Sequence, residues 1–481
     1  MSNFKKDARF EHKLVMLGCG FIGQGVLPLI FRHIDIRPEQ VSIITSNSRG
    51  KEVARYFDVA FCINPISPEN YKTILGAALN SGDFLLNLSS DVESSWLIDF
   101  CCEREILYLD TCIDSWLGES TDATLSVSRR SLYNLREETL NLKRKYNNSS
   151  TTAVLAHGAN PGIVSHLVKQ ALLNIAQDEA LENTQKNNST VQIPNSQLAW
   201  AQLSQKLGIK AIHIAERDTQ VSATRKLPNE FVNTWSIDGL VGEGLQPAEL
   251  GWGSHEKYFP VDGGRHTFGD KAAIFLNQPG AAVRVRTWLP LAGPQIGYLI
   301  THNEAISLAS YLSIGEGDHP AYRPTVHYAY HPCDDAVLSI VELQERNWEI
   351  QDKRRPITDE IMSGIDELGV LLVGHKKGAY WFGSRLDIHD ARKLAPYNSA
   401  TSLQVSAGVI SGMVWAMRHP NKGIVEAEEM DFKEVLAIAE PYWGKLVGEY
   451  SDWNPIAGRN GLFPEDIDVD DPWQFKNFRV V

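Results

Sequence analysis

The sequence predicts an α/β fold, with a doubly wound, largely parallel sheet followed by a second domain of the α+β class. Five short apolar runs alternate with helix-length segments in the first 150 residues, and the stretch from 210 to about 390 is richer in strands, turns and aromatic residues. With 481 residues, of which 43% are hydrophobic, the chain can bury the cores of two or three domains.

The five apolar runs have the length and composition of buried parallel strands, and the segments between them are long enough for crossover helices. Residues 131–146 have the pattern of an amphipathic helix. The polar stretch 147–152 then marks a boundary, so the first domain is expected at 1–152. The expected strands are 13–17, 41–45, 59–64, 83–89 and 106–111.

Beyond the boundary the pattern changes. A strand, a Gly/Pro turn and a helix are expected over 153–176, and the polar residues 177–197 predict a surface loop. We expect the second domain at 153–394. A long helix rich in small residues follows, within a C-terminal segment at 395–481.

Composition excludes several classes of protein. The net charge of −13 argues against a nucleic-acid partner and is compatible with cationic small molecules. Six cysteines without a CxxC pair predict reduced core thiols. The N-terminus lacks the pattern of a signal peptide, and no apolar run is as long as a membrane span, so we expect a cytoplasmic protein with no membrane partner.

The segment VMLGCGFIGQGVLPLI places a G-x-G-x-x-G pattern directly after a strand and before a helix. Gly18 permits the tight turn, Gly20 lets the backbone approach a pyrophosphate, and Gly23 lets helix and strand pack closely. Phe21 and Ile22 open the helix whose N-terminus would face the anion. The context predicts a Rossmann-type dinucleotide site; the alternative is a glycine-rich turn without a ligand.

The residues at the end of the next predicted strand leave the identity of the dinucleotide open. Many such sites place an Asp or Glu there, which accepts from the ribose hydroxyls of NAD. This chain has Ser46, Asn47 and Arg49 instead. Ser46 or Asn47 could hydrogen-bond a ribose, whereas Arg49 would suit the 2′-phosphate of NADP.

Several segments beyond the glycine turn carry a family resemblance: HGANPGIVSHL, IAERDTQ, NTWS, VGEGLQPAELGWG, QPGAAVRVRTWLP, GYLITHNEAISLA and TSLQVSAGVISGM. In these segments, which are spread over the whole chain, it resembles the bacterial homospermidine synthases of the saccharopine dehydrogenase-like group. The resemblance implies a tightly held NAD(H) and a transfer of an aminobutyl group through imine intermediates. Two putrescines would give homospermidine and ammonia; spermidine can replace one putrescine, and 1,3-diaminopropane is then released.

The resemblance also assigns roles to the parts of the chain. It implies that 153–394 binds substrate and forms a homodimer, and that the C-terminal segment returns to the nucleotide domain. Thr401 and Ser402 of that segment would lie near the cofactor.

A diamine substrate is a dication, so the site needs carboxylates and aromatic faces for ammonium groups and a base for the reacting nitrogen. Asp91 and Asp114 follow successive predicted strands and match family positions in the substrate pocket; either could instead cap a helix or turn. Glu216 and Glu243 match acidic family residues that bind amine nitrogen, although an isolated Glu is usually a solvated surface group.

Three further residues match family positions. Trp235 would lie at the pocket entrance and attract ammonium groups, with a core tryptophan as the alternative. Asn160 would lie beside the nicotinamide; without the resemblance it has the pattern of a helix N-cap followed by Pro161. His302 would face the substrate, where a neutral imidazole could pass protons.

We expect no metal. His327 and His331 have i, i+4 spacing, but no accompanying glutamate motif is present and a proline follows at once. The nearest alternative function is a net oxidoreductase of the saccharopine or carboxynorspermidine dehydrogenase type, in which Arg217, Arg284 or Arg286 would bind a substrate carboxylate. A second alternative is a protein that binds the nucleotide without catalysis.

Overall fold

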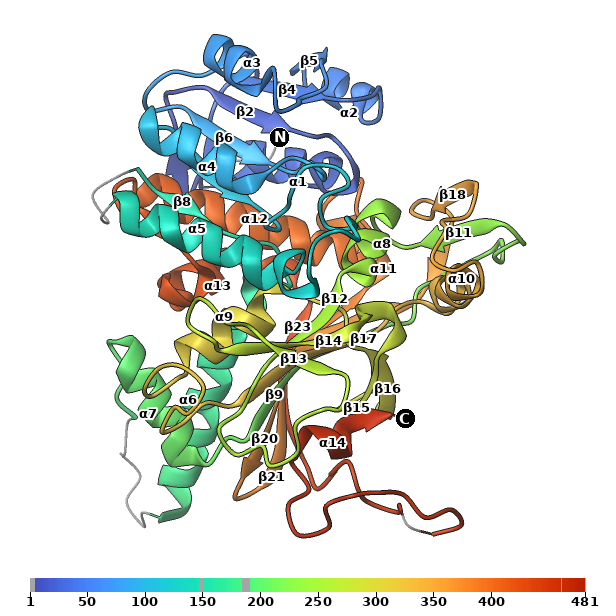
Figure 1. Ribbon diagram of the computed structural model, residues 1–481. Helices are drawn as coiled ribbons and strands as arrows, with labels where there is room; N and C mark the ends of the chain where they lie inside the picture. The colour runs from blue at the N-terminus through green and yellow to red at the C-terminus, as the bar shows by residue number, and fades with distance from the viewer. Residues whose placement is uncertain (1–4, 147–150, 184–190, 460, 481) are drawn as a thin grey trace.

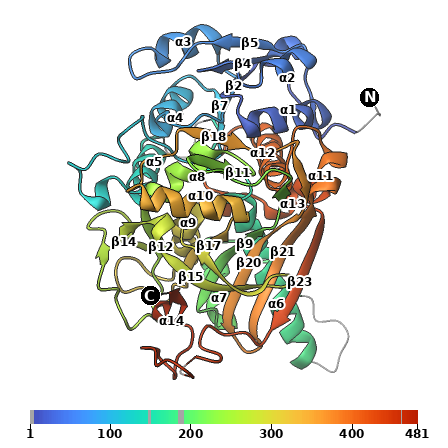
Figure 2. The ribbon, with the colours of Figure 1, turned by 90° about the vertical axis from the view of Figure 1, so that its right-hand side faces the viewer.

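The computed structural model describes residues 5–146, 151–183, 191–459 and 461–480. Two sheets dominate the molecule, and a layer of helices lies between them (Figure 1). A view turned by 90° shows the same arrangement, with the N-terminal sheet at one end and the larger sheet toward the other (Figure 2).

The N-terminal sheet has seven strands, all parallel, in the order β22-β8-β7-β6-β2-β4-β5. Apart from the edge strand β22, this is the order of a dinucleotide-binding sheet, and its winding reverses between β2 and β6. The predicted Rossmann-type fold is confirmed. The strands are β2 (Leu14–Leu17), β4 (Val41–Thr45), β5 (Ala60–Ile63), β6 (Phe84–Asn87), β7 (Leu107–Asp110), β8 (Ala153–Val154) and β22 (Ile424–Val425).

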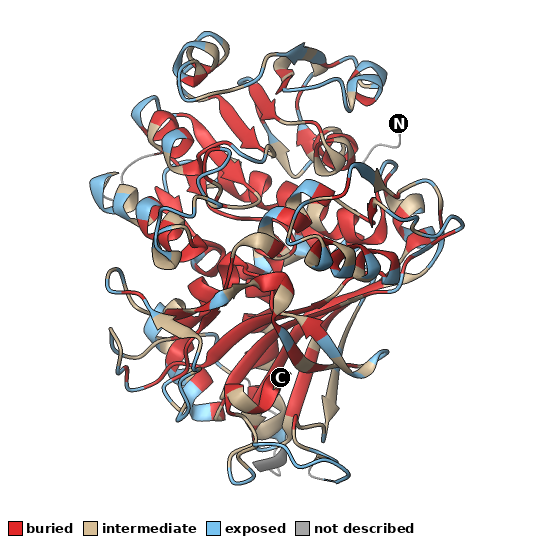
Figure 3. Cartoon of the chain, turned by 45° about the vertical axis from the view of Figure 1, so that its right-hand side comes forward, coloured by how far each residue is buried: buried red, intermediate tan, exposed pale blue. Residues whose placement is uncertain are grey.

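Helices cover both faces of this sheet, so its central strands are buried on two sides (Figure 3). In β2, Leu14 and Met16 pack in one core with α1 and α12, whereas Val15 and Leu17 pack in a second core with α3 and α4. Burial on both faces explains why the strand reads as a continuous apolar run. The helices around the sheet are α1 (Phe21–His33), α2 (Lys51–Tyr56), α3 (Tyr71–Ala78), α4 (Ser94–Glu103), α5 (Leu132–Tyr146), α12 (Ala400–Arg418) and α13 (Phe432–Ala439).

The larger sheet has eleven strands and is mixed, with β9 and β17 parallel at its centre. Helix α6 packs against β20 and β21, and α9 packs against β12 and β17. The predicted second α+β domain is therefore present. Its strands are β9 (Ala211–Asp218), β12 (Pro247–Gly251), β13 (Gly263–Arg265), β14 (Ala273–Pro279), β15 (Arg284–Leu289), β16 (Gly293–Tyr298), β17 (Thr325–His331), β20 (Ile365–His375), β21 (Gly378–Asp387), β23 (Lys445–Ser451) and β24 (Arg479–Val480).

Smaller pairings complete the fold. They join β1 (Ala8–Arg9) to β3 (Ile34–Asp35), β10 (Val221–Ser222) to β19 (Ile361–Ser363), and β11 (Glu230–Asn233) to β18 (Lys353–Pro356). The other helices are α6 (Ile163–Asn183), α7 (Gln197–Leu207), α8 (Ile237–Leu245), α9 (Asn303–Tyr311), α10 (Asp334–Glu345), α11 (Ile388–Leu394) and α14 (Phe475–Phe478).

The chain passes between the two sheets more often than the expected division at 1–152, 153–394 and 395–481 provides for. Strand β8 extends the N-terminal sheet beyond residue 152. Helix α12 packs on α1, whereas β23 and β24 then join the larger sheet. The surface loop expected at 177–197 is also partly wrong, because α6 continues to Asn183; 184–190 lies outside the described residues.

Helix α12 is the one helix among the described residues that is long and apolar enough to cross a membrane, whereas the sequence led us to expect none. Its apolar window is 89% buried inside the molecule, as in the core helix of a folded domain. None of the six cysteines, all of which lie in the described part of the chain, forms a disulfide; Cys62 is exposed and Cys112 half-buried, and the other four are buried.

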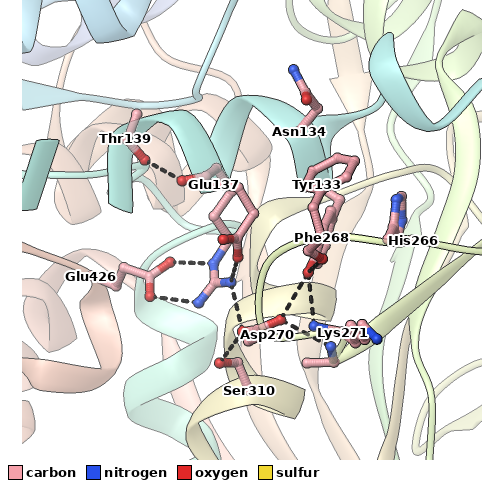
Figure 4. A network of polar contacts seen from close by, with 12 residues as sticks. Tyr133, Asn134, Glu137, Thr139, His266, Phe268, Asp270, Lys271, Ser310 and Glu426 are labelled. Carbon is pink, nitrogen blue, oxygen red and sulfur yellow. Dashed lines mark hydrogen bonds and ion pairs between the residues drawn. The ribbon is translucent and has the colours of Figure 1, made fainter. Parts of the chain in front are cut away.

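An ionic network joins the helix layer to the larger sheet's domain. The guanidinium of Arg136 on α5 makes two hydrogen bonds to Glu426, at 2.7 and 2.9 Å, and one to Asp270 at 3.1 Å. Figure 4 shows Glu426 and Asp270 approaching this point from opposite sides, with Ser310 of α9 below. Segments far apart in the sequence are therefore held together at a buried point.

Candidate active site between the two sheets

Two adjoining cavities lie where the carboxyl ends of the parallel strands meet the second domain. The larger one, which we call the crevice, has a volume of about 660 Å³ and is lined by the glycine turn, the ends of β4 and β6, and part of α8. The smaller one, the inner cavity, has about 110 Å³ and reaches to the start of α9. Five residues line both: Ser90, Asp91, Ser120, Asp238 and Gly242. In such sheets ligands bind at this reversal of the winding.

The glycine turn lines the crevice with bare backbone. Gly18 has φ +83°, and a Cβ there would lie 2.7 Å from the carbonyl oxygen of Leu88. A Cβ on Gly23 would lie 3.0 Å from the carbonyl oxygen of Gly18, so strand and helix are in close contact. A Cβ on Gly20, by contrast, would meet none of the described residues within 4 Å. The space in front of Gly20 is open for a ligand. Phe21 and Ile22 are half-buried and line neither cavity.

Ser46, Asn47 and Arg49 line the crevice at the end of β4. The side chain of Asn47 accepts from the backbone N–H of Arg49 at 2.9 Å and donates to the hydroxyl of Ser46 at 3.3 Å. These contacts hold the uncharged side chains of Ser46 and Asn47 in the wall of the crevice, next to Arg49.

Four carboxylates surround the inner cavity: Asp91, Asp114, Asp238 and Glu243. No Lys or Arg lines it in the part of the chain that the structure describes. Burial raises the pKa of Asp114 to about 6, although the backbone N–H groups of Asp91 and Ser115 hydrogen-bond its carboxylate. Asp114 therefore both fixes the turn at Asp91 and lines the inner cavity.

The imidazole of His302 lies between two carboxylates. Its Nε2 is 3.1 Å from Oε2 of Glu243, and its Nδ1 is 3.3 Å from Oε1 of Glu304. Burial opposes the charged form, but the two carboxylates outweigh it and raise the pKa of His302 to about 10. The two carboxylates therefore favour the imidazolium form of His302, whereas the sequence led us to expect a neutral imidazole.

Glu216, on β9, is buried next to this group. Its carboxylate accepts from the amide of Asn160 at 2.7 Å and from the hydroxyl of Tyr328, whose ring lies 4.3 Å from that of His302. Burial raises the pKa of Glu216, against these two hydrogen bonds. Asn160 precedes α6 by three residues and points to Glu216, so it is not the N-cap of that helix.

Trp235 is half-buried and does not line either cavity. Its indole N–H donates to the hydroxyl of Tyr330 at 3.0 Å, and a Cβ on Gly239 would lie 2.9 Å from its ring. Because Gly239 lines the inner cavity, Trp235 supports the wall of the cavity from behind.

Residues 14–154 match the family described as saccharopine dehydrogenase NADP binding domain, and residues 158–452 match saccharopine dehydrogenase C-terminal domain. Homospermidine synthase of Blastochloris viridis is 47% identical over the full length of both chains, and that of Mesorhizobium japonicum is 46% identical over 97% of this chain and 96% of its own. The chain belongs to the homospermidine synthase family.

Solved structures agree with this membership. The homospermidine synthase of Legionella pneumophila, in complex with NAD, has a TM-score of 0.90 at 47% identity and covers 98% of each chain. Saccharopine dehydrogenase of Saccharomyces cerevisiae has a TM-score of 0.51 at 11% identity, over 92% of this chain and 100% of its own, and shares the fold.

The dehydrogenase alternative is not favoured within the homospermidine synthase family. Arg217 hydrogen-bonds Asp334 at 2.9 Å, and Arg286 lies 3.5 Å from Glu465. Neither these nor Arg284 line the inner cavity. Among the described residues a substrate carboxylate would therefore find no Lys or Arg there, and the His302 imidazole is already paired with Glu243 and Glu304.

The predicted cofactor residues Thr401 and Ser402 lie apart from the two cavities, as do the two histidines whose spacing was considered for a metal and rejected. Thr401 accepts from the amide of Gln220 at 3.1 Å, and Ser402 forms a capping box with Ser399 at the start of α12; neither lines the crevice. The ring of His327 packs 4.1 Å from that of His213, and His331 contacts the carbonyl of Ile296. Thr401 and Ser402 thus order the start of α12.

Sequence reasoning missed Asp238, Glu304 and Tyr328. Asp238 follows the N-cap Ser236 and has the pattern of an ordinary first-turn acid. Glu304 lies two residues after His302 in a segment already singled out, and Tyr328 lies between the two histidines considered for a metal. Only the folding of β17 beside β9 places Tyr328 against Glu216.

Proposed function

We propose that this chain is a homospermidine synthase, which joins two putrescines into homospermidine and releases ammonia. With spermidine in place of one putrescine, 1,3-diaminopropane would leave instead. The observation that carries the proposal is a cavity of about 110 Å³, bounded by four carboxylates and opening onto the crevice at the glycine turn. A small cavity with a carboxylate lining suits a short, thin amine.

We propose that the crevice holds NAD. The fit is supported by the open backbone at Gly20 and by the N-terminus of α1 beyond it, which has no side-chain cap. The nicotinamide supplies reversible two-electron oxidation when bound. Ser46 and Asn47 would hydrogen-bond the ribose. Arg49 would suit the 2′-phosphate of NADP, and the family matched by residues 14–154 is described as NADP-binding. We propose NAD because the relative from Legionella pneumophila, which is 47% identical, is in complex with NAD.

The side chains of the inner cavity would hold the amine. We assign the ammonium groups to Asp91, Asp114 and Glu243, which line this cavity. Glu216 lines neither cavity but lies beside the His302–Tyr328 ring contact; its raised pKa suits proton uptake near neutral pH, and we assign to it the proton of the reacting nitrogen. His302, as an imidazolium, would fix Glu243 rather than act as the base.

Asn160, Trp235 and the start of α12 would act by positioning. Asn160 orients the carboxylate of Glu216, and Trp235 keeps Gly239 in the cavity wall. Thr401 and Ser402 would fix the start of α12, which packs on the nucleotide-binding helix α1. We also propose that the protein is cytoplasmic and that it forms a homodimer. Light scattering on the purified protein would test the dimer.

Isotope labelling tests the proposed reaction. Putrescine carrying deuterium on the carbon next to one nitrogen should give homospermidine that retains the label, with ammonia released and no NADH accumulating in proportion to turnover. NADH that accumulates with each turnover would indicate a net dehydrogenase. Bound dinucleotide without amine turnover would indicate a binding protein.

A further inference from the structure

Asp238 lies at the junction of the crevice and the inner cavity and lines both of them. It is in the first turn of α8, where Ser236 caps the helix by accepting from the N–H of Gly239. The next turn of α8 carries Gly242 and Glu243, which line the inner cavity. The position of Asp238 is therefore fixed relative to the proposed amine-binding residues.

Asp91 lines the same junction from the nucleotide domain. Its backbone is held in the left-handed region, with φ 61°, and its N–H donates to Asp114 at 2.9 Å. Burial, and then the charge on Asp238, raise the pKa of Asp91. Two carboxylates from different domains thus repel each other across the opening, and a cation between them would relieve that repulsion.

One cation already contacts this group. Nη1 of Arg354, on β18, lies 2.5 Å from Oδ1 of Asp238, and both side chains are about half exposed. Arg354 lines the crevice but not the inner cavity. Exposed ion pairs of this kind are weak, so a substrate ammonium can exchange with the guanidinium at small cost.

We infer that Asp238 is a further amine-binding residue, which receives an ammonium group of the substrate where the inner cavity opens, and that Arg354 is the counter-ion which this ammonium displaces. The inference rests on the proposed function, since it requires a cationic amine as substrate. It assigns Asp238 to binding and not to proton transfer.

Steady-state kinetics with putrescine test the inference. Asp238→Asn should raise KM at least tenfold with kcat changed less than threefold, and Asp238→Glu should recover most of the loss. Arg354→Met should lower KM two- to fivefold, because it removes a competing cation. If the ion pair were purely structural, Asp238→Asn and Arg354→Met would have the same effect. Both would reduce stability, and Arg354→Met would not lower KM.

The matched control is Asp334→Asn, which breaks the ion pair between Arg217 and Asp334 on the same domain and should leave KM unchanged. Bound dinucleotide is measured in every variant, so that a change in cofactor retention is not mistaken for a change in amine binding. If the parent protein turns over putrescine but Asp238→Asn keeps the parental KM, the inference is wrong. If the parent shows no amine turnover, the proposed function fails instead.

Discussion

The two carboxylates on either side of His302 decide what this residue can do in the reaction. An imidazole with a pKa near 10 holds its proton throughout the neutral range and cannot serve as a base there. Because this pKa is raised from 6.5, the ionic contacts of His302 stabilise the fold fully below pH 6.5 and lose that effect as the pH rises toward 10.

Glu243→Gln should therefore change the pH dependence as well as the rate. The variant loses an anionic contact of the amine, so kcat/KM should fall about tenfold to 10²-fold, the effect of losing a hydrogen bond to a charged group. It also loses the carboxylate that contributes most to raising the pKa of His302, and the pH profile of kcat/KM should show a new ionisation at lower pH than about 10. Glu345→Gln, an exposed residue outside both cavities, is the control for loss of one charge. A variant with parental turnover would remove Glu243 from the mechanism.

At the scale of elements, the strand ends and the glycine turn were predictable because each depends on local sequence. The five expected strands coincide with β2, β4, β5, β6 and β7 to within two residues at each end. The relation between Glu216, Tyr328 and Asn160 was not predictable from spacing, since it arises only when β9, β17 and the turn before α6 meet. Trp235 was expected at the entrance, but its contact with Tyr330 depends on strand pairing in the larger sheet.

The glycine turn allows a test that separates binding from folding. Gly20 has a negative φ, and its Cβ would be clear of the described chain, so Gly20→Val should fold and melt like the parent without cofactor. The same Cβ fills the space that a pyrophosphate needs, so the variant should purify without dinucleotide. Added NAD should raise the Tm of the parent stripped of its cofactor but not that of the variant. Gly18→Val, which clashes with Leu88, is the contrasting case and should lose stability. Full cofactor occupancy in Gly20→Val would contradict the assignment of the turn.

At the scale of the whole molecule, the network at Arg136 links α5 to Glu426 beside the N-terminal sheet and to Asp270 of the second domain (Figure 4). Arg136 is almost fully buried, so loss of its guanidinium would leave the carboxylates that contact it without a compensating charge. Although burial opposes the ionisation of Asp270, Arg136 holds the pKa of that carboxyl below its ordinary value. Asp270 therefore stabilises the fold above its unfolded pKa of 3.8, and this contribution is lost as the pH falls below it.

Arg136→Met should lower the free energy of unfolding by about 3 to 5 kcal/mol at neutral pH, because it leaves buried carboxylates without a partner. The deficit should shrink as the pH falls, since protonation then removes those charges in the variant at less cost. Adding Glu426→Gln should recover part of the loss for the same reason. Lys145→Met, on the same helix, removes an exposed cation that pairs with Asp99 and Glu103, and it should change stability little. Urea unfolding at several pH values measures all four proteins; a deficit that stays constant with pH would mean that packing, and not charge, makes Arg136 necessary for holding the two domains together.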